Sequence, residues 1–201
     1  MTTFPAFPGL RHFYTGISDQ GLEYLVQSAP YLELLSLKLE NPPLSHYILA
    51  AASNFTRLIT LVIQFGSQSS LSGQDLLLLA QKCPHLAELE IGYVRSQPSV
   101  FGMTDSIIDE VSQRIPKLSH LRLILDHPEP LTWNSLLSLA RHCKNLETLR
   151  LSCGFTWQEA VDGTQENIFS RLQSSMLFLT KITGMRRLRM TRRLPFSPLV
   201  C

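Results

Sequence analysis

Residues 83–91 have the sequence Cys-Pro-His-Leu-Ala-Glu-Leu-Glu-Ile, which contains the pattern L-x-x-L-x-L with isoleucine at the last position. Copies with the same offsets occur at Leu32/Leu35/Leu37, Leu58/Leu61/Ile63, Leu118/Leu121/Leu123 and Leu146/Leu149/Leu151. A weaker copy, Met185/Leu188/Met190, lies near the end of the chain, and Leu10/Phe13 is a degenerate opening candidate. A repeat of this kind decides the architecture, because each copy buries its apolar face only by stacking on its neighbours.

A second apolar column precedes each copy by three positions. It consists of Ala29, Phe55, Cys83, Ile115, Cys143 and Ile182. The segments before this column have helical periodicity, as in Leu76/Leu79/Ala80/Cys83. Plausible helix caps precede them at Ser18 or Asp19, Ser45, Ser72, Thr104 and Thr132. Prolines at 30, 84 and 116 stop the helices, so each unit is predicted to be a helix, a tight turn and a short strand.

The spacing between first positions is 26, 28, 32, 28 and 39 residues along the chain. Leucine-rich repeats have about 20–29 residues, so two units contain insertions. We therefore expect an α/β leucine-rich-repeat solenoid with a parallel sheet on its concave face and helices on its convex face. Residues 1–201 would form one domain of about six repeats, clearest over 18–152, with an insertion at 153–167 and a weak last repeat at 168–193.

The helix ends and strand ends resemble the cysteine-containing leucine-rich repeats of F-box proteins and their fungal relatives. The similar segments are 18–25 with 30–37, Cys83-Pro-His-Leu, Cys143-Lys-Asn-Leu and Leu151-Ser-Cys153. The resemblance implies substrate recognition for a cullin-type ubiquitin ligase, whose adaptor binds the F-box. We find no F-box-like segment in this sequence, so adaptor binding is expected only if an F-box is supplied outside this chain.

Composition and motifs favour a binding protein over an enzyme. Met1 to Gly16 is interrupted by prolines and does not resemble a secretory signal, and no apolar run reaches the ~20 residues of a membrane span. We expect an intracellular protein, cytoplasmic or nuclear. The sequence contains no H-E-x-x-H, G-x-S-x-G or phosphate-binding glycine motif. We therefore assign no catalytic, cofactor-binding or metal-binding residue.

The cysteines follow the packing columns rather than the spacing of a metal site. There is no CxxC pair among the four cysteines, whereas a structural zinc site needs four converging ligands. A free cysteine otherwise behaves as a small apolar residue. We expect buried, unreactive thiols at Cys83, Cys143 and Cys153.

Strand alternation predicts the residues that bind a protein partner. The middle residue of each L-x-L pair, and the residue two before it, point away from the core. On the charged strands these are Glu88, Glu90, His120, Arg122, Thr148, Arg150, Arg187 and Arg189. The alternative is that Glu90 and Arg122 only pair with each other, an exposed contact worth at most ~1 kcal/mol.

A basic C-terminal segment provides a rival function. Glu166 is the last acidic residue, and seven basic residues follow it. Such a segment attracts nucleic acid or another anionic ligand, but it also suits the solvated end cap that a repeat array needs. The sequence favours the end cap, so nucleic acid is the less favoured partner, and a truncated repeat protein without independent function is a further alternative.

Overall fold

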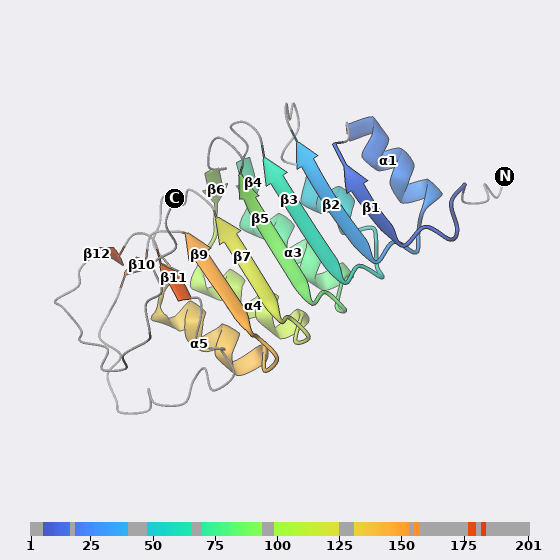
Figure 1. The fold of residues 1–201 in the computed structure, drawn as a ribbon. Coiled ribbons are helices and arrows are strands. Elements are labelled where there is room, and N and C mark those ends of the chain that lie inside the picture. Colours follow the sequence, from blue (N-terminus) through green and yellow to red (C-terminus); the bar gives the residue numbers. More distant parts are fainter. Residues whose placement is uncertain are drawn as a thin grey trace, which may run out of the picture.

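The computed structural model describes residues 6–16, 19–39, 48–65, 70–93, 99–124, 131–152, 155–156, 177–179 and 182–183. In this part of the chain a seven-stranded sheet forms one layer, with the strands in the order β1-β2-β3-β5-β7-β9-β11 (Figure 1). Every pairing in it is parallel. The strands are β1 (His12–Thr15), β2 (Leu34–Leu39), β3 (Thr60–Phe65), β5 (Glu88–Tyr93), β7 (His120–Ile124), β9 (Thr148–Ser152) and β11 (Leu177–Leu179). The predicted α/β fold with a parallel sheet is confirmed.

The helices form a second layer behind this sheet (Figure 1). They are α1 (Asp19–Ser28), α2 (Ile48–Ala52), α3 (Gly73–Lys82), α4 (Asp105–Arg114) and α5 (Trp133–His142). Each one connects two neighbouring strands of the sheet, which is the arrangement that parallel strands require. Within the described ranges no helix covers the opposite face of the sheet. We call that surface the helix-free face.

Short strands lie beside the helix starts and form two small parallel sheets, β4-β6 and β12-β10-β8. They are β4 (Ser70–Ser72), β6 (Ser99–Phe101), β8 (Leu131–Thr132), β10 (Phe155–Thr156) and β12 (Ile182–Thr183). The chain runs from β4 directly into α3 and from β8 directly into α5. These pairings therefore hold the helix starts of successive units at a fixed distance from one another.

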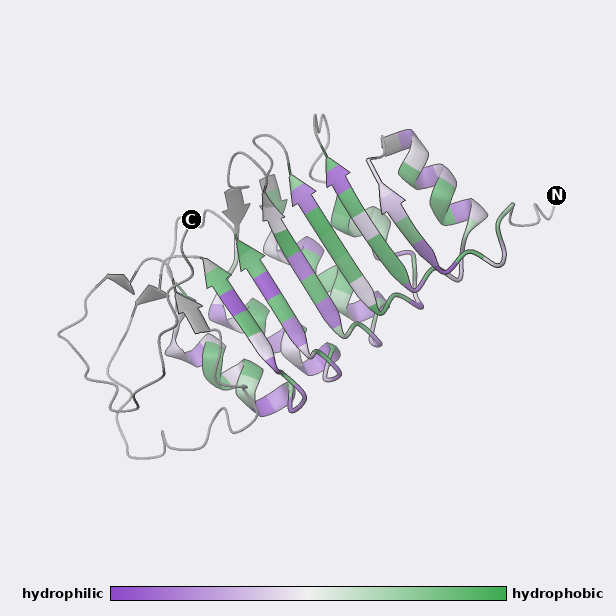
Figure 2. Cartoon of the chain, viewed as in Figure 1, coloured by the Kyte–Doolittle hydropathy of each residue, from purple (hydrophilic) through white to green (hydrophobic). Residues whose placement is uncertain are grey.

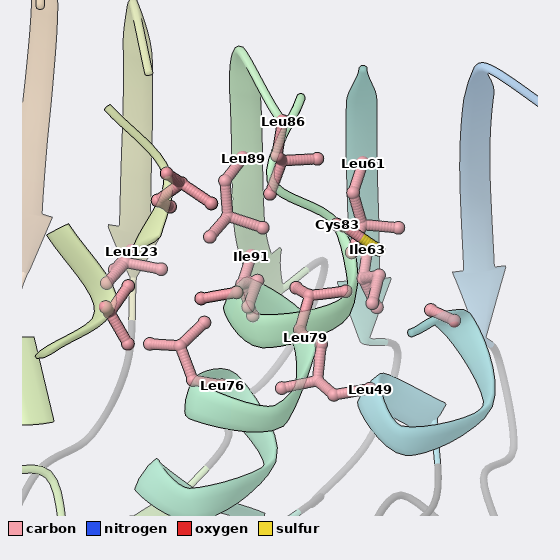
Figure 3. Close-up of a cluster of buried hydrophobic side chains, with 14 of the residues drawn as sticks. Leu49, Leu61, Ile63, Leu76, Leu79, Cys83, Leu86, Leu89, Ile91 and Leu123 are labelled. Atoms are coloured by element: carbon pink, nitrogen blue, oxygen red, sulfur yellow. The ribbon is translucent and has the colours of Figure 1, made fainter. Parts of the chain in front are cut away.

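The strand register places the repeated leucines side by side. Leu35, Leu61, Leu89, Leu121 and Leu149 form one row, and Leu37, Ile63, Ile91, Leu123 and Leu151 form the next. All ten side chains are buried. Figure 3 shows how Leu76 and Leu79 of α3 point toward the strand residues Leu89 and Ile91. Burying each leucine fully contributes about 1.5–3 kcal/mol, so the two rows and the helices that cover them form the core.

The backbone repeats its hydrogen bonds from unit to unit. In the turn of each unit the N–H of the first leucine donates to the carbonyl three residues earlier, as Leu86 does to Cys83 at 3.1 Å. One carbonyl then accepts two N–H groups of the next unit, as Ile59 does from Ala87 and Glu88. Among the described residues the turn bond occurs six times, including Leu10 to Phe7, and the double acceptance occurs five times. The backbone geometry is thus independent of the residue types that vary between units.

The predicted helix boundaries are confirmed where the structure describes them. Ser72, Thr104 and Thr132 are N-caps, and their hydroxyl oxygens accept N–H groups in the first turn. Helices α1, α3 and α4 end two residues before the prolines at 30, 84 and 116. Asp19 is the first residue of α1, while Ser18 and Ser45 lie outside the described residues.

The strand beside β9 differs from the one that the sequence predicted. It is β11, in which Leu177 pairs with Leu149 and Leu179 with Leu151, and not the copy at 185–190. Leu177 lies 28 residues after Leu149, the spacing of two other units, but Ser174 occupies the position where the pattern has leucine. Strand β11 falls within the predicted last repeat at 168–193, and the copy at Met185/Leu188/Met190 lies outside the described residues and stays a prediction.

Candidate functional site: the helix-free face

The residues predicted on β5, β7 and β9 lie together on the helix-free face. Glu88, His120 and Thr148 are register partners in one row, and Glu90, Arg122 and Arg150 in the next. None of these six side chains is buried, whereas the leucines between them are. Figure 2 shows the resulting hydrophilic bands across β5, β7 and β9. Arg187 and Arg189, which were predicted on the same face, lie outside the described residues.

An ion pair links β5 and β7, the first two strands of this group. Arg122 Nη1 lies 2.8 Å from Glu90 Oε1, and the two side chains are 39% and 28% exposed. Such an exposed pair contributes at most about 1 kcal/mol. The Nε of Arg122 is buried and has no hydrogen-bond partner among the described residues. The pair therefore uses only part of the donor capacity of the guanidinium group, which has five N–H donors.

The arginines of β7 and β9 are direct neighbours in the sheet. Arg122 and Arg150 are register partners, and adjacent strands lie about 4.8 Å apart. Like charges at directly opposed positions destabilise a sheet. On the other side of Arg122, its register partner on β5 is the carboxylate residue Glu90. The charged row therefore places Glu90, Arg122 and Arg150 side by side on three successive strands.

Hydrogen bonds orient the other row. The hydroxyl of Thr60 donates to Glu88 Oε2 at 3.4 Å. Just before β7, the Oγ of Ser119 lies 2.9 Å from His120 Nδ1 and donates to the carbonyl of Ala87 at 3.0 Å. The Thr60–Glu88 contact joins β3 to β5, and the Ser119 contacts tie His120 to the residue before β5, so Glu88 and His120 are held in place on the face.

The row that contains Glu90, Arg122 and Arg150 is uncharged in its N-terminal part. The register partners there are Tyr14 on β1, Ser36 on β2 and Val62 on β3, and Tyr14 is 65% exposed. Figure 2 shows β3 as largely hydrophobic, in contrast to β5 and β7. The row is thus divided into an uncharged part over β1–β3 and a charged part over β5–β9.

Two of the predicted buried thiols are confirmed. Cys83 and Cys143 are free and buried, and burial raises the pKa of Cys83 to about 11 and that of Cys143 to about 12. A thiol with such a pKa stays protonated and is a poor nucleophile or metal ligand. A search of the described residues finds no cluster of three or more His, Cys, Asp or Glu that could hold a metal ion. Cys153 lies outside these residues.

The sequence analysis missed a polar seam between α4 and α5. Asp105 accepts hydrogen bonds from the backbone N–H and the hydroxyl of Thr132 and from the hydroxyl of Ser135. One turn further, Asp109 Oδ1 lies 3.4 Å from His142 Nε2. The i, i+4 spacing of the two aspartates places them on one face of α4 and was the available signal. The seam joins two units, and we assign it to packing.

Comparison with known proteins adds no family assignment, because no protein-family model and no curated protein matches the chain. Among the described helices, none combines the length and the apolar character needed to cross a membrane. Of the basic residues after Glu166, none falls within the described ranges.

Proposed function

We propose that this chain is a leucine-rich-repeat protein whose units form a solenoid, and that it binds a protein partner on the helix-free face. The proposal is supported by the repeated leucine rows, by the described helices, which all lie on one side of the sheet, and by the repeated turn and ladder hydrogen bonds. Solenoids of this kind leave one extended face of the sheet open to ligands. That open face corresponds to the concave surface expected from the sequence.

The observation that carries the proposal is the charged part of the helix-free face. Six polar side chains lie in register on three neighbouring strands, so the positions of their Cα atoms relative to one another are set by the strand pairing. Charges in a fixed arrangement select partners with complementary charge and fix the register of binding. A partner that fits this surface has an acidic group opposite β7 and β9, and a basic or hydroxyl group opposite Glu88.

Within the cell, the sequence resemblance supports a role as the substrate-recognition part of an F-box-type ubiquitin ligase receptor. In that role the chain is a binding protein and not an enzyme. It would contact the ligase adaptor only through an F-box supplied outside this chain. The proposal needs no cofactor and no metal ion.

The test is capture of partners by the tagged full chain, followed by mass spectrometry, with the variant Arg122→Glu/Arg150→Glu alongside. We expect the variant to fold, as judged by circular dichroism and urea melts, and to lose the partners that wild type retains. The control Lys117→Glu/Lys144→Glu makes the same change in net charge at exposed turn positions and is expected to retain them. Equal retention by the Arg122/Arg150 variant would refute binding through this face.

The rival function predicts a different outcome in the same experiment. Binding to nucleic acid through the basic C-terminal segment is dominated by phosphate contacts and weakens steeply as salt rises. Captured material that is mostly RNA or DNA, insensitive to the Arg122/Arg150 variant and lost at moderate salt, would favour that function over protein binding.

A further inference from the structure

Positive charge gathers on the turns that lead from the helices into β3, β5, β7 and β9. We call these segments, residues 53–59, 81–87, 113–119 and 141–147, the turn rim. They lie in a row along the edge of the sheet where the four strands begin (Figure 1). Of the residues up to Glu166, they contain six of the eleven basic ones and one of the sixteen acidic ones. The turn rim therefore carries a net charge of +5, whereas the other five basic and fifteen acidic residues of that stretch give −10.

Three lysines of the turn rim are exposed and contact only uncharged groups. The ammonium group of Lys82 lies 3.2 Å from Asn54 Oδ1, and that of Lys117 lies 3.2 Å from His85 Nδ1. Both contacts reach back to the turn of the preceding unit. The ammonium group of Lys144 donates to the backbone carbonyl four residues earlier at 3.1 Å. Within the described part of the chain, none of the three forms an ion pair with a carboxylate.

The helix dipole explains part of this charge. Lys82, Arg114 and Arg141 lie in the last turns of α3, α4 and α5, where the partial negative charge of a helix end favours a cation. Arg57 and Lys117 lie in the turns, outside the helices, so the dipole gives no reason for their charge. An exposed row of cations with few carboxylates raises the local potential and attracts anionic groups.

The N-terminal end of the turn rim adds apolar surface. Tyr31, in the turn before β2, and Ile59 are 39% and 42% exposed. The guanidinium group of Arg57 lies over the ring of Tyr31, 4.5 Å from its centroid. The N–H of Ile59 donates to the carbonyl of Glu33, two residues after Tyr31. A tyrosine, an arginine and an isoleucine thus share two neighbouring turns, and tyrosine and arginine are enriched among the residues that dominate protein–protein binding.

This apolar surface favours a peptide over a nucleic acid as the anionic partner. Single-stranded nucleic acid binds through its phosphates and by stacking bases on aromatic rings. Two guanidinium groups already lie over the ring of Tyr31, those of Arg57 and, 5.6 Å from the centroid, of Arg11. An exposed isoleucine offers nothing to a phosphate. A peptide can place carboxylates on the lysines and an apolar side chain on Ile59.

We propose that the turn rim binds an acidic segment of a protein, made of several Asp or Glu residues that follow an apolar residue. The apolar side chain contacts Ile59 and Tyr31, and the carboxylates pair with Lys82, Lys117 and Lys144. The turns of Ile59 and Lys144 are three strand spacings apart, about 14 Å, which an extended peptide covers in about five residues. The turn rim is not part of the helix-free face, so this inference does not rest on the function proposed above.

The probe is the peptide Gly-Leu-Glu-Asp-Glu-Asp-Glu-Gly with an N-terminal fluorescein and a C-terminal amide. Its binding to the full chain is measured by fluorescence anisotropy at low and at moderate salt. Companion probes with the same dye replace every acidic residue with its amide, replace Leu with Ser, or consist of oligothymidylate of equal length. We expect the acidic Leu peptide to bind most tightly, the Ser peptide more weakly and the amide peptide not at all.

Variants of the chain locate the binding site. Lys117→Glu/Lys144→Glu is expected to weaken the acidic Leu peptide by about fivefold for each ion pair that is lost. Arg122→Glu/Arg150→Glu makes the same change in net charge on the helix-free face, and a smaller effect is expected from it because salt screens distant charges. Ile59→Ser is expected to weaken the Leu peptide and to leave the Ser peptide unchanged. Circular dichroism checks that each variant is folded.

Equal weakening by the two double variants would overturn the turn rim as the site, because it would show a general effect of net charge. Absence of binding by the acidic Leu peptide at low salt would overturn it as well. Tighter binding of oligothymidylate than of the peptide, lost in Lys117→Glu/Lys144→Glu, would assign the turn rim to nucleic acid instead. Neither outcome bears on the helix-free face, which the capture experiment tests separately.

Discussion

The sulfur of Cys83 lies 3.4 Å from the carbonyl oxygen of Phe55, at the end of the preceding unit, and the thiol donates a hydrogen bond to it. Cys143 occupies the same position two units later, and its sulfur lies 3.8 Å from the carbonyl oxygens of Ser112 and Ile115. Helix ends leave carbonyl groups without partners inside the helix. The buried thiols supply donors near these ends and thereby connect successive units.

We predict that Cys83 and Cys143 resist alkylation in the native chain. Burial raises the pKa of these thiols to about 11 and about 12, so at pH 8 almost none of either is thiolate, which is the reactive form. Iodoacetamide labelling followed by peptide mass spectrometry should find both unmodified in buffer and fully modified in guanidinium chloride. If both thiols of the folded chain reacted as fast as they do in guanidinium chloride, the burial of Cys83 and Cys143 described above would be contradicted.

Shortening a buried leucine side chain should lower the free energy of unfolding strongly, whereas shortening a side chain on the helix-free face should change it little. Leu121 is buried between its register partners Leu89 and Leu149, and Leu121→Ala is expected to cost about 2–5 kcal/mol in the free energy of unfolding. The control is Ser36→Ala, on the helix-free face, with an expected change within about 0.5 kcal/mol. Urea melts measure both. Similar stability of the two variants would refute the inward orientation of the row.

A close backbone approach explains a glycine at the start of α3. A Cβ at Gly73 would lie 2.5 Å from the carbonyl oxygen of Gly102, which has φ +65°. Gly→Ala in a helix normally stabilises by about 0.5–1 kcal/mol. At this position we expect Gly73→Ala to destabilise by about 1–3 kcal/mol, because backbone atoms have to shift.

The control for Gly73 is Gly92, where a Cβ would meet nothing within 4 Å. Gly92→Ala is expected to leave the thermal midpoint almost unchanged or to raise it slightly. A stabilising effect of Gly73→Ala would show that the approach of α3 to Gly102 is looser than the structure has it.

The seam between α4 and α5 should make stability depend on pH. The hydrogen bond from Ser138, with further contributions from His142 and Gln113, lowers the pKa of Asp109 below its ordinary value of 3.8. A carboxyl group with a lowered native pKa stabilises the fold above its unfolded pKa, and this contribution is lost as the pH falls through the native pKa. Asp109→Asn should therefore lower the melting temperature at pH 6 more than at pH 3.

Ser138→Ala provides the matched variant for that experiment, since it removes the main cause of the lowered pKa and keeps the carboxylate. We expect a weaker pH dependence below pH 4 in this variant than in wild type. An unchanged difference between wild type and Asp109→Asn from pH 6 to pH 3 would show that the charge of Asp109 does not stabilise the seam.

Features that repeat along the chain could be predicted from the sequence. Contacts between two units could not be predicted from it. The alternation that turns Leu121 inward and Arg122 outward is a local property of a strand, and five aligned copies fixed its phase. Strand β11 could not be predicted because Ser174 stands where the other copies have the first leucine, so its segment does not match the pattern. The contact of Asp105 with Thr132 depends on the length of the connection between α4 and α5, which no residue pattern reports.

The carbonyls that accept two N–H groups of the next unit belong to Arg11, Glu33, Ile59, Ala87 and Ser119. These residues share no size, charge or polarity, although the backbone geometry at all five is the same. The position therefore tolerates almost any side chain without a penalty to strand pairing. A protein built in this way can acquire a new specificity along the rim of the sheet by single substitutions, while the scaffold that presents them stays unchanged.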